Sequence, residues 1–154
     1  MPDMPILPLT LNPNPLLRKK LEEVSDIADE DIQQLVEDMR VTMVAAQGIG
    51  LAGNQIGRDL RIFTIDKQLA KKAGIPDVFI NPVIENVSQK TSRMEEGCLS
   101  IPGKFDEVRR VLEVTVSAID ERGKAFRIKA GGLLARVLQH EIDHLNGMLF
   151  IDRL

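Results

Sequence analysis

The chain has 154 residues, a net charge of −3, 44% hydrophobic residues and 28% charged residues. This length suits one domain, residues 1–154, and the composition is that of a folded protein with an apolar core, which excludes a disordered chain. The acidic balance and the lack of Trp and Tyr argue against binding nucleic acid through its phosphates or its stacked bases.

The cysteine content and the N-terminal residues indicate the cellular compartment in which the protein works. A single cysteine excludes an internal disulfide and suits a reducing environment. The N-terminal residues do not follow the pattern of a signal peptide, and no apolar run reaches the roughly 20 residues that span a bilayer. We therefore expect a cytoplasmic protein with neither a membrane nor a nucleic acid as its direct partner.

The first part of the chain predicts an extended start and one helix. Each proline up to Pro15 disfavours a helix at the residue before it, so this stretch is expected to lie extended across the surface. From Asp31 to Ala46, apolar residues recur at three- and four-residue intervals behind an acidic cluster, which predicts an amphipathic helix. The glycine-rich stretch from Gly48 to Gly57 predicts a turn.

The rest of the chain predicts a sheet and a second helix. Short runs of β-forming residues predict strands near Arg61–Ile65, Val78–Ile84, Leu112–Ile119 and Ala125–Lys129. An apolar stripe predicts a helix from Leu133 to Leu145, with Asn146-Gly147 as its stop. The expected fold is α+β, with mostly antiparallel sheets packed around this C-terminal helix and one N-terminal helix.

The strongest functional signal is His140-Glu141-Ile142-Asp143-His144 in the C-terminal helix. Two histidines four residues apart project from the same face of a helix and can bind one metal ion, with the glutamate beside the water that the metal activates. They are the only two histidines in the chain. The alternative is a helix that carries two surface histidines by chance, which the spacing and the intervening glutamate disfavour.

A catalytic site of this kind needs a third protein ligand. Metzincin peptidases place a histidine where this chain has Phe150, and thermolysin-like peptidases use a downstream glutamate, whereas the only acid after His144 is Asp152. The third ligand is therefore expected upstream. The only thiol, Cys98, is the candidate, although a lone cysteine is more often a buried small residue, and a nucleophilic Cys–His pair is a further alternative.

A third segment, Gly48-Ile49-Gly50-Leu51-Ala52-Gly53-Asn54-Gln55, matches the glycine pattern of dinucleotide-binding loops. Those loops follow a strand and open a helix, whereas here a helix precedes the glycines. The plainer interpretation is a tight turn whose small residues let the backbone pass close to another group. In a functional interpretation, the amide of Gln55 donates a hydrogen bond to a developing oxyanion.

The three segments, in this order, resemble the peptide deformylase family. The family pattern is a G-x-G-x-A-A-x-Q-like segment, then Glu-Gly-Cys-Leu-Ser, then Gln-His-Glu-x-Asp-His. The likeness extends through Asn81-Pro82, Ile101-Pro102-Gly103 and Phe150-Ile151-Asp152, so it covers nearly the whole chain. Gly53 departs from the pattern, because the family usually has alanine there.

The resemblance implies a metal-dependent hydrolase that removes the N-formyl group from the formyl-methionine of nascent polypeptides and releases formate. One divalent ion, Fe(II) by preference with Zn(II) or Ni(II) also accommodated, would be bound by Cys98, His140 and His144. Glu141 would carry the proton from the attacking water to the departing amine. Gln55 and the backbone N–H of Leu99 would hold the oxyanion.

The resemblance also implies how the substrate binds. Gly50 and Gly97 match the positions that pair with the peptide backbone, and Ile49, Leu133 and Val137 would line the methionine pocket, with simple core packing as the alternative for these three. Formylated nascent peptides belong to bacteria, organelles and phage-infected hosts, so we expect a bacterial or phage setting. Many bacterial members continue into a helix that docks on the ribosome, whereas this sequence stops at Leu154, so the resemblance leaves ribosome docking by that route open.

Two other functions are still open at this point. A zinc aminopeptidase could share the helix motif and the role of Glu141, and assays on unformylated peptides would expose it. A non-catalytic metal-binding or interaction protein could keep the fold, with Gly53 and the short C-terminus as signs of lost activity. Substitution of Glu141 separates the second from an enzyme, because a binding protein has no turnover to lose.

Overall fold

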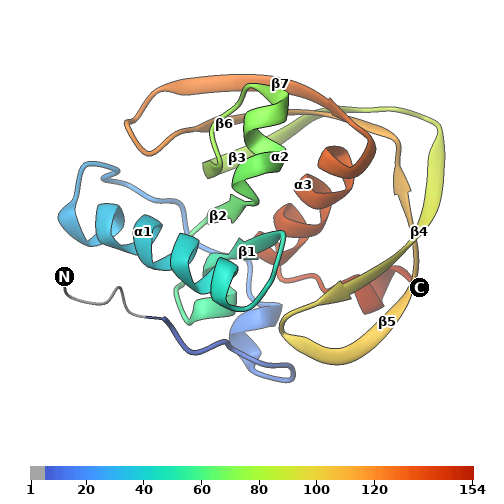
Figure 1. Ribbon diagram of the computed structural model, residues 1–154, viewed down its shortest axis with the longest axis horizontal. Helices are drawn as coiled ribbons and strands as arrows, with labels where there is room; N and C mark the ends of the chain where they lie inside the picture. Colours follow the sequence, from blue (N-terminus) through green and yellow to red (C-terminus); the bar gives the residue numbers. More distant parts are fainter. Residues whose placement is uncertain (1–5) are drawn as a thin grey trace.

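Helix α3 (Gly132–Leu145) lies at the centre of the molecule and packs against strands of both its sheets (Figure 1). The computed structural model describes residues 6–154, so residues 1–5 of the expected extended start lie outside the described part. The other helices and strands, in chain order, are η1 Pro15–Arg18, α1 Glu30–Ala45, β1 Gly50–Ala52, η2 Gly53–Ile56, β2 Ile62–Ile65, α2 Lys67–Ala73, β3 Val78–Val87, β4 Thr91–Cys98, β5 Ile101–Val111, β6 Glu113–Ile119, β7 Ala125–Gly131 and η3 Phe150–Arg153.

The strands form two antiparallel sheets. Five strands pair in the order β1-β2-β3-β6-β7, and β4 pairs with β5 in a separate hairpin. Strand β1 is an edge of the larger sheet, and β4 has a second edge that β5 does not cover. Two strand edges are therefore free to pair with an extended peptide.

Local sequence explains where the helices begin and end. The side chain of Asp29 accepts a hydrogen bond from the backbone N–H of Asp31 and caps α1, which carries acidic residues in its first turn, where the helix dipole favours them. Helix α3 has a mostly buried apolar stripe and ends at Asn146, followed by Gly147 with a φ of 76°. Because α3 is surrounded by strands, it needs this apolar stripe to pack against them.

The core is aliphatic with a small aromatic centre. Phe63 of β2 and Phe79 of β3 stack with ring centroids 4.7 Å apart, and both are fully buried. Leu138, Ile142 and Leu145 of α3 pack against this sheet. Within residues 6–154, no helix combines the length and apolar character needed to cross a bilayer.

The α+β fold expected from the sequence is confirmed, and both expected helices and all four expected strands are present. Their observed bounds differ from the expected ones by at most three residues, and several coincide. The glycine-rich stretch predicted as a turn instead contains the short strand β1 and the helix η2. Helix α2, strands β4 and β5 and the short helices were not predicted from the sequence.

Packing explains the glycine at position 53. A Cβ atom on Gly53 would lie 2.5 Å from the backbone oxygen of Leu60, a distance that requires the backbone to move. The loop between η2 and β2 is thus closed tightly over this residue. This loop requires a glycine at position 53. The departure from the alanine of the family pattern therefore has a packing reason and is no sign of lost activity.

We predict that Gly53→Ala lowers the free energy of unfolding by about 1–3 kcal/mol, the usual cost of overpacking. Gly131→Ala is the matched control, because its φ is −130° and the nearest atom to an added Cβ is 3.9 Å away. Urea denaturation of both variants measures the difference. Equal stabilities would contradict the packing argument.

Candidate metal centre

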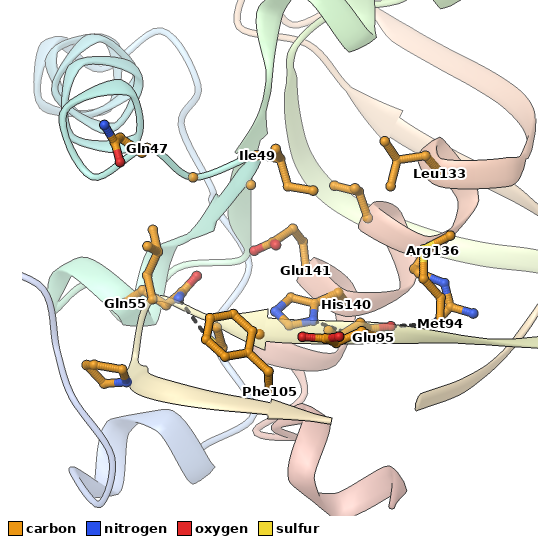
Figure 2. A pocket seen from close by; sticks show the side chains of 18 of the residues that line it. Gln47, Ile49, Gln55, Met94, Glu95, Phe105, Leu133, Arg136, His140 and Glu141 are labelled. Carbon is orange, nitrogen blue, oxygen red and sulfur yellow. Dashed lines mark hydrogen bonds and ion pairs between the residues drawn. The ribbon is translucent and has the colours of Figure 1, made fainter. Parts of the chain in front are cut away.

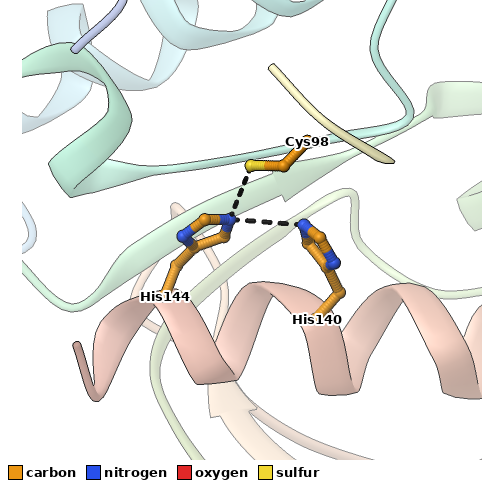
Figure 3. A group of neighbouring side chains, drawn as sticks. All are labelled: Cys98, His140 and His144. Atoms are coloured by element: carbon orange, nitrogen blue, oxygen red, sulfur yellow. Dashed lines mark hydrogen bonds between the residues drawn. The ribbon is translucent and has the colours of Figure 1, made fainter. Parts of the chain in front are cut away.

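Three side chains from two elements converge on one point (Figure 3). Cys98 ends β4, and His140 and His144 project from one face of α3. The Nε2 atoms of the two histidines are 3.3 Å apart, Sγ of Cys98 lies 3.3 Å from Nε2 of His144, and the three ligand atoms all lie within 4.8 Å of one another. Nitrogen and sulfur ligands of a tetrahedral metal are about 3.3–3.6 Å apart, so this arrangement fits a metal ion at the centre.

The electrostatics of the two histidines suit a cation. Burial lowers the pKa of His144 well below its ordinary value, which keeps its imidazole neutral and able to ligate. Burial also acts to lower the pKa of His140, but hydrogen bonds with Cys98 and Glu96 outweigh it and raise that pKa to about 10. The surroundings of His140 therefore stabilise positive charge, as a metal site must.

Glu141 is a buried carboxyl beside the three ligands. Burial raises its pKa to about 7, because the charged form loses its solvation. Its Oε1 atom has no hydrogen-bond partner within residues 6–154, and Oε2 lies so close to Gly50 that an added Cβ would be 2.5 Å away. The carboxyl can therefore hold or release a proton near neutral pH at the wall of the site.

A cavity of about 450 Å³ opens beside these residues (Figure 2). Gly50 of β1 and Gly97 of β4 line it with backbone from the two free strand edges. Helix α3 lines the cavity with the apolar side chains of Leu133 and Val137, and Figure 2 shows Leu133 across from Ile49. Leu133 and Ile49 are about half exposed, at 47% and 51%, so neither is a core residue, whereas Val137 is buried and belongs to both core and wall.

The Gln55 amide is held in one orientation at the cavity. Its Oε1 atom accepts a hydrogen bond from the backbone N–H of Ala52 at 2.9 Å. Its Nε2 group is thereby turned toward the site, where it donates to Oγ of Ser100 at 3.2 Å and lies 3.5 Å from Sγ of Cys98. This is a donor whose direction is set before any substrate binds.

Two further groups complete this side of the site. Asn54 is fully buried and donates from Nδ2 to the backbone oxygen of His144 at 2.8 Å, which ties η2 to the metal-binding helix. Leu99 lies in the turn between β4 and β5, and its backbone N–H has no acceptor within the described residues. A free backbone donor thus stands next to Cys98.

Behind the ligands, Glu96 joins the β4–β5 hairpin to α3. Its Oε1 atom accepts from Nδ1 of His140 at 2.9 Å, which orients that imidazole. Arg110 of β5 binds both oxygens of Glu96, at 2.6 and 2.9 Å, and Arg136 of α3 donates to Oε2 at 2.6 Å. Burial acts to raise the pKa of Glu96, but these hydrogen bonds outweigh it and hold the pKa at about 2.

The same network continues to the end of the described chain. Arg110 also donates to Oδ2 of Asp143 at 2.9 Å, and Arg153 of η3 binds both oxygens of Asp143, at 2.6 and 2.8 Å. Glu96, Arg110, Arg136 and Asp143 are all buried. Their charges are mutually paired, so none is left uncompensated in the interior.

The structure brings every sequence-predicted site residue into or against this one cavity. Sequence reasoning missed the residues behind the ligands. Arg136 stands four residues before His140 on the same helix face, which is a signal that could have found it. Asn54 and Ser100 lie inside two of the segments quoted above, which is the signal that could have found them, whereas Arg110 carries none, because a local pattern does not distinguish a buried polar residue from an exposed one.

Comparisons with known proteins agree with this geometry. The family model described as polypeptide deformylase matches residues 6–154. A peptide deformylase of Picosynechococcus is 46% identical over 98% of this chain and 80% of its own length. One from Rhizobium meliloti is 48% identical over 97% of this chain and 85% of its own length.

Solved structures show the same fold. The peptide deformylase of Synechococcus elongatus in complex with actinonin has a TM-score of 0.89 and 42% identity, covering 100% of this chain and 81% of that one. The peptide deformylase of Thermotoga maritima has a TM-score of 0.90 and 37% identity, covering 97% of this chain and 98% of that one.

We predict that Arg110→Met lowers the free energy of unfolding by about 3 kcal/mol, the low end for breaking a buried ion pair, because Arg136 and Arg153 still hold the two carboxylates. Arg127→Met is the control, since its pair with Glu85 is exposed and should contribute less than about 1 kcal/mol. Guanidinium denaturation measures both. A similar loss for the two variants would contradict the role given to Arg110.

Proposed function

The chain belongs to the polypeptide deformylase family, and from this premise we propose how its residues remove the formyl group from N-terminal formyl-methionine. The reaction is hydrolysis of a formamide, and its products are formate and a free amino group. The observation that carries the proposal is the convergence of Cys98, His140 and His144 beside the buried carboxyl of Glu141 in one cavity. Residues 1–154 would act as one catalytic domain.

We assign the three converging side chains as ligands of one divalent metal. The bound ion would polarise a water molecule and lower its pKa, as metals do in hydrolases. The ligand atoms have the separations that such an ion needs, and Glu96 fixes the imidazole of His140 from behind. The protein thus presents the ligands with little rearrangement.

Glu141 would move the proton. It lies on α3 between the two histidines, with one oxygen free of any partner within the described residues. Its pKa of about 7 lets it accept a proton from the attacking water and give it to the departing nitrogen at neutral pH. One carboxyl can therefore serve both proton transfers.

Gln55 and Leu99 would stabilise the oxyanion that forms as the formyl carbon becomes tetrahedral. The Nε2 group of Gln55 is already directed to the site by its bond to Ala52, and the N–H of Leu99 has no other acceptor within residues 6–154. Donors fixed before the charge develops need no reorganisation during the reaction. They favour the transition state over the bound substrate.

The substrate peptide would lie between the two free strand edges. Gly50 and Gly97 present backbone from β1 and β4, which supports pairing with an extended chain on both sides. The methionine side chain would contact Ile49, Leu133 and Val137. A thioether chain suits such an aliphatic wall.

We predict that Glu141→Gln reduces formate release from formyl-Met-Ala-Ser by roughly 10²–10⁴-fold while the protein keeps its metal, because only the proton transfers are lost. Glu107→Gln, an exposed acid on β5, is the control and should retain turnover. Formate release and metal content by mass spectrometry are measured together.

The same assay separates the alternatives. Hydrolysis of unformylated Met-Ala-Ser would indicate an aminopeptidase. A folded, metal-loaded wild-type protein that releases no formate would indicate a metal-binding protein without catalytic function. Unchanged turnover in Glu141→Gln would overturn the role of that residue alone.

We further propose Fe(II) as the preferred metal, with Zn(II) and Ni(II) accommodated, since mixed thiolate and imidazole ligation suits all three. Protein purified under nitrogen should then contain about one iron per chain and lose activity in air, whereas nickel-loaded protein should not. Cys98→Ala should contain less metal than the wild type. Zinc as the bound metal, with air-stable activity, would contradict the preference.

A further inference from the structure

The segment Thr10–Asn12, which we name the N-terminal strap, contacts both sides of the catalytic cavity. The backbone N–H of Thr10 donates to the backbone oxygen of Gln55 at 2.7 Å. The backbone N–H of Asn12 donates to the backbone oxygen of Ser100 at 2.9 Å. Figure 1 shows this blue segment along the lower edge of the molecule, beside the elements that carry these residues.

These two bonds complete a closed ring around the oxyanion donors. Gln55 belongs to η2, which follows β1 of the larger sheet, whereas Ser100 follows Leu99 in the turn between β4 and β5 of the hairpin. Their side chains meet through the Nε2–Oγ hydrogen bond of 3.2 Å, and the strap joins their main chains. The ring therefore sets the separation of the two loops.

The strap is itself anchored at both ends. Before it, the N–H of Leu7 donates to Oγ1 of Thr42 in α1 at 2.9 Å, and Leu7 and Leu9 pack against a core cluster. After it, Asn14 caps η1, in which Leu17 is fully buried. A segment fixed on both sides can transmit its position to the loops that it contacts.

We propose that Thr10 and Asn12 are positioning residues that hold the two oxyanion donors, Gln55 and the N–H of Leu99, at their working separation. This inference rests on the roles proposed above for those two donors. Oxyanion stabilisation depends on donor placement to within about 0.5 Å, because the hydrogen bonds must match the position that the charge will occupy. The strap supplies this constraint from outside the cavity.

Proline substitution tests the strap, because it removes the backbone donor. Thr10→Pro should lower kcat about tenfold with KM and metal content unchanged, since a displaced donor costs less than the 10²–10³ of a deleted one. Asn12→Pro is a second variant, because it removes the N–H that donates to the backbone oxygen of Ser100, and it should lower kcat in the same way. Leu11→Pro is the control, since its N–H has no acceptor within residues 6–154.

A double-mutant cycle tells positioning from general destabilisation. If the strap acts through Gln55, Thr10→Pro should change kcat less than about twofold in a Gln55→Ala background. Additive losses, a loss in Leu11→Pro equal to that in Thr10→Pro, or failure of both test variants to fold would overturn the strap proposal. A Gln55→Ala enzyme with full kcat would instead overturn the oxyanion role of Gln55, and the strap proposal with it.

Discussion

The site depends on the hydrogen bonds and ion pairs made by the buried carboxylate of Glu96. This carboxylate receives a hydrogen bond from His140, a proposed metal ligand, and is paired with two buried arginines, one on the β4–β5 hairpin and one on α3. A buried ion pair adds little net stability over an apolar contact, yet an unpaired charge in its place is strongly unfavourable. The network therefore favours the one arrangement of the β4–β5 hairpin on α3 in which all these charges are paired. That arrangement brings Cys98 next to the two histidines.

Much of this molecule could be predicted from its sequence. The helices α1 and α3 have an apolar repeat of three to four residues, and the strands of the large sheet have β-branched runs bounded by turn residues. The spacing of His140 and His144 is meaningful once a helix is predicted, because helical geometry alone places them together. Elimination left Cys98 as the candidate third ligand and the glycine-rich segment offered Gln55 as a donor, whereas the backbone donor of Leu99 and the complete set came only from the resemblance to a family.

The β4–β5 hairpin shows why the rest was missed. Val108 is its only fully buried apolar side chain, and its other buried side chains include the charged residues Glu96 and Arg110. Such strands are held by backbone pairing and by ion pairs to α3, so they lack the alternation of apolar and polar residues that identifies a strand. Strand β1, with three residues, is too short for any pattern, and the strap acts through backbone N–H groups, which every residue except proline has.

The proposed ligands are far apart along the chain, since Cys98 and His144 are separated by 46 positions. During synthesis, an ion that meets only the thiol or only the two imidazoles has an incomplete site, so tight binding follows docking of the hairpin on α3 and adds its free energy to the docked state. A metal held by these three proposed ligands would therefore be taken up by the folded protein. The ion it acquires then depends on which divalent metals are available in the surrounding fluid, as much as on the ligands themselves.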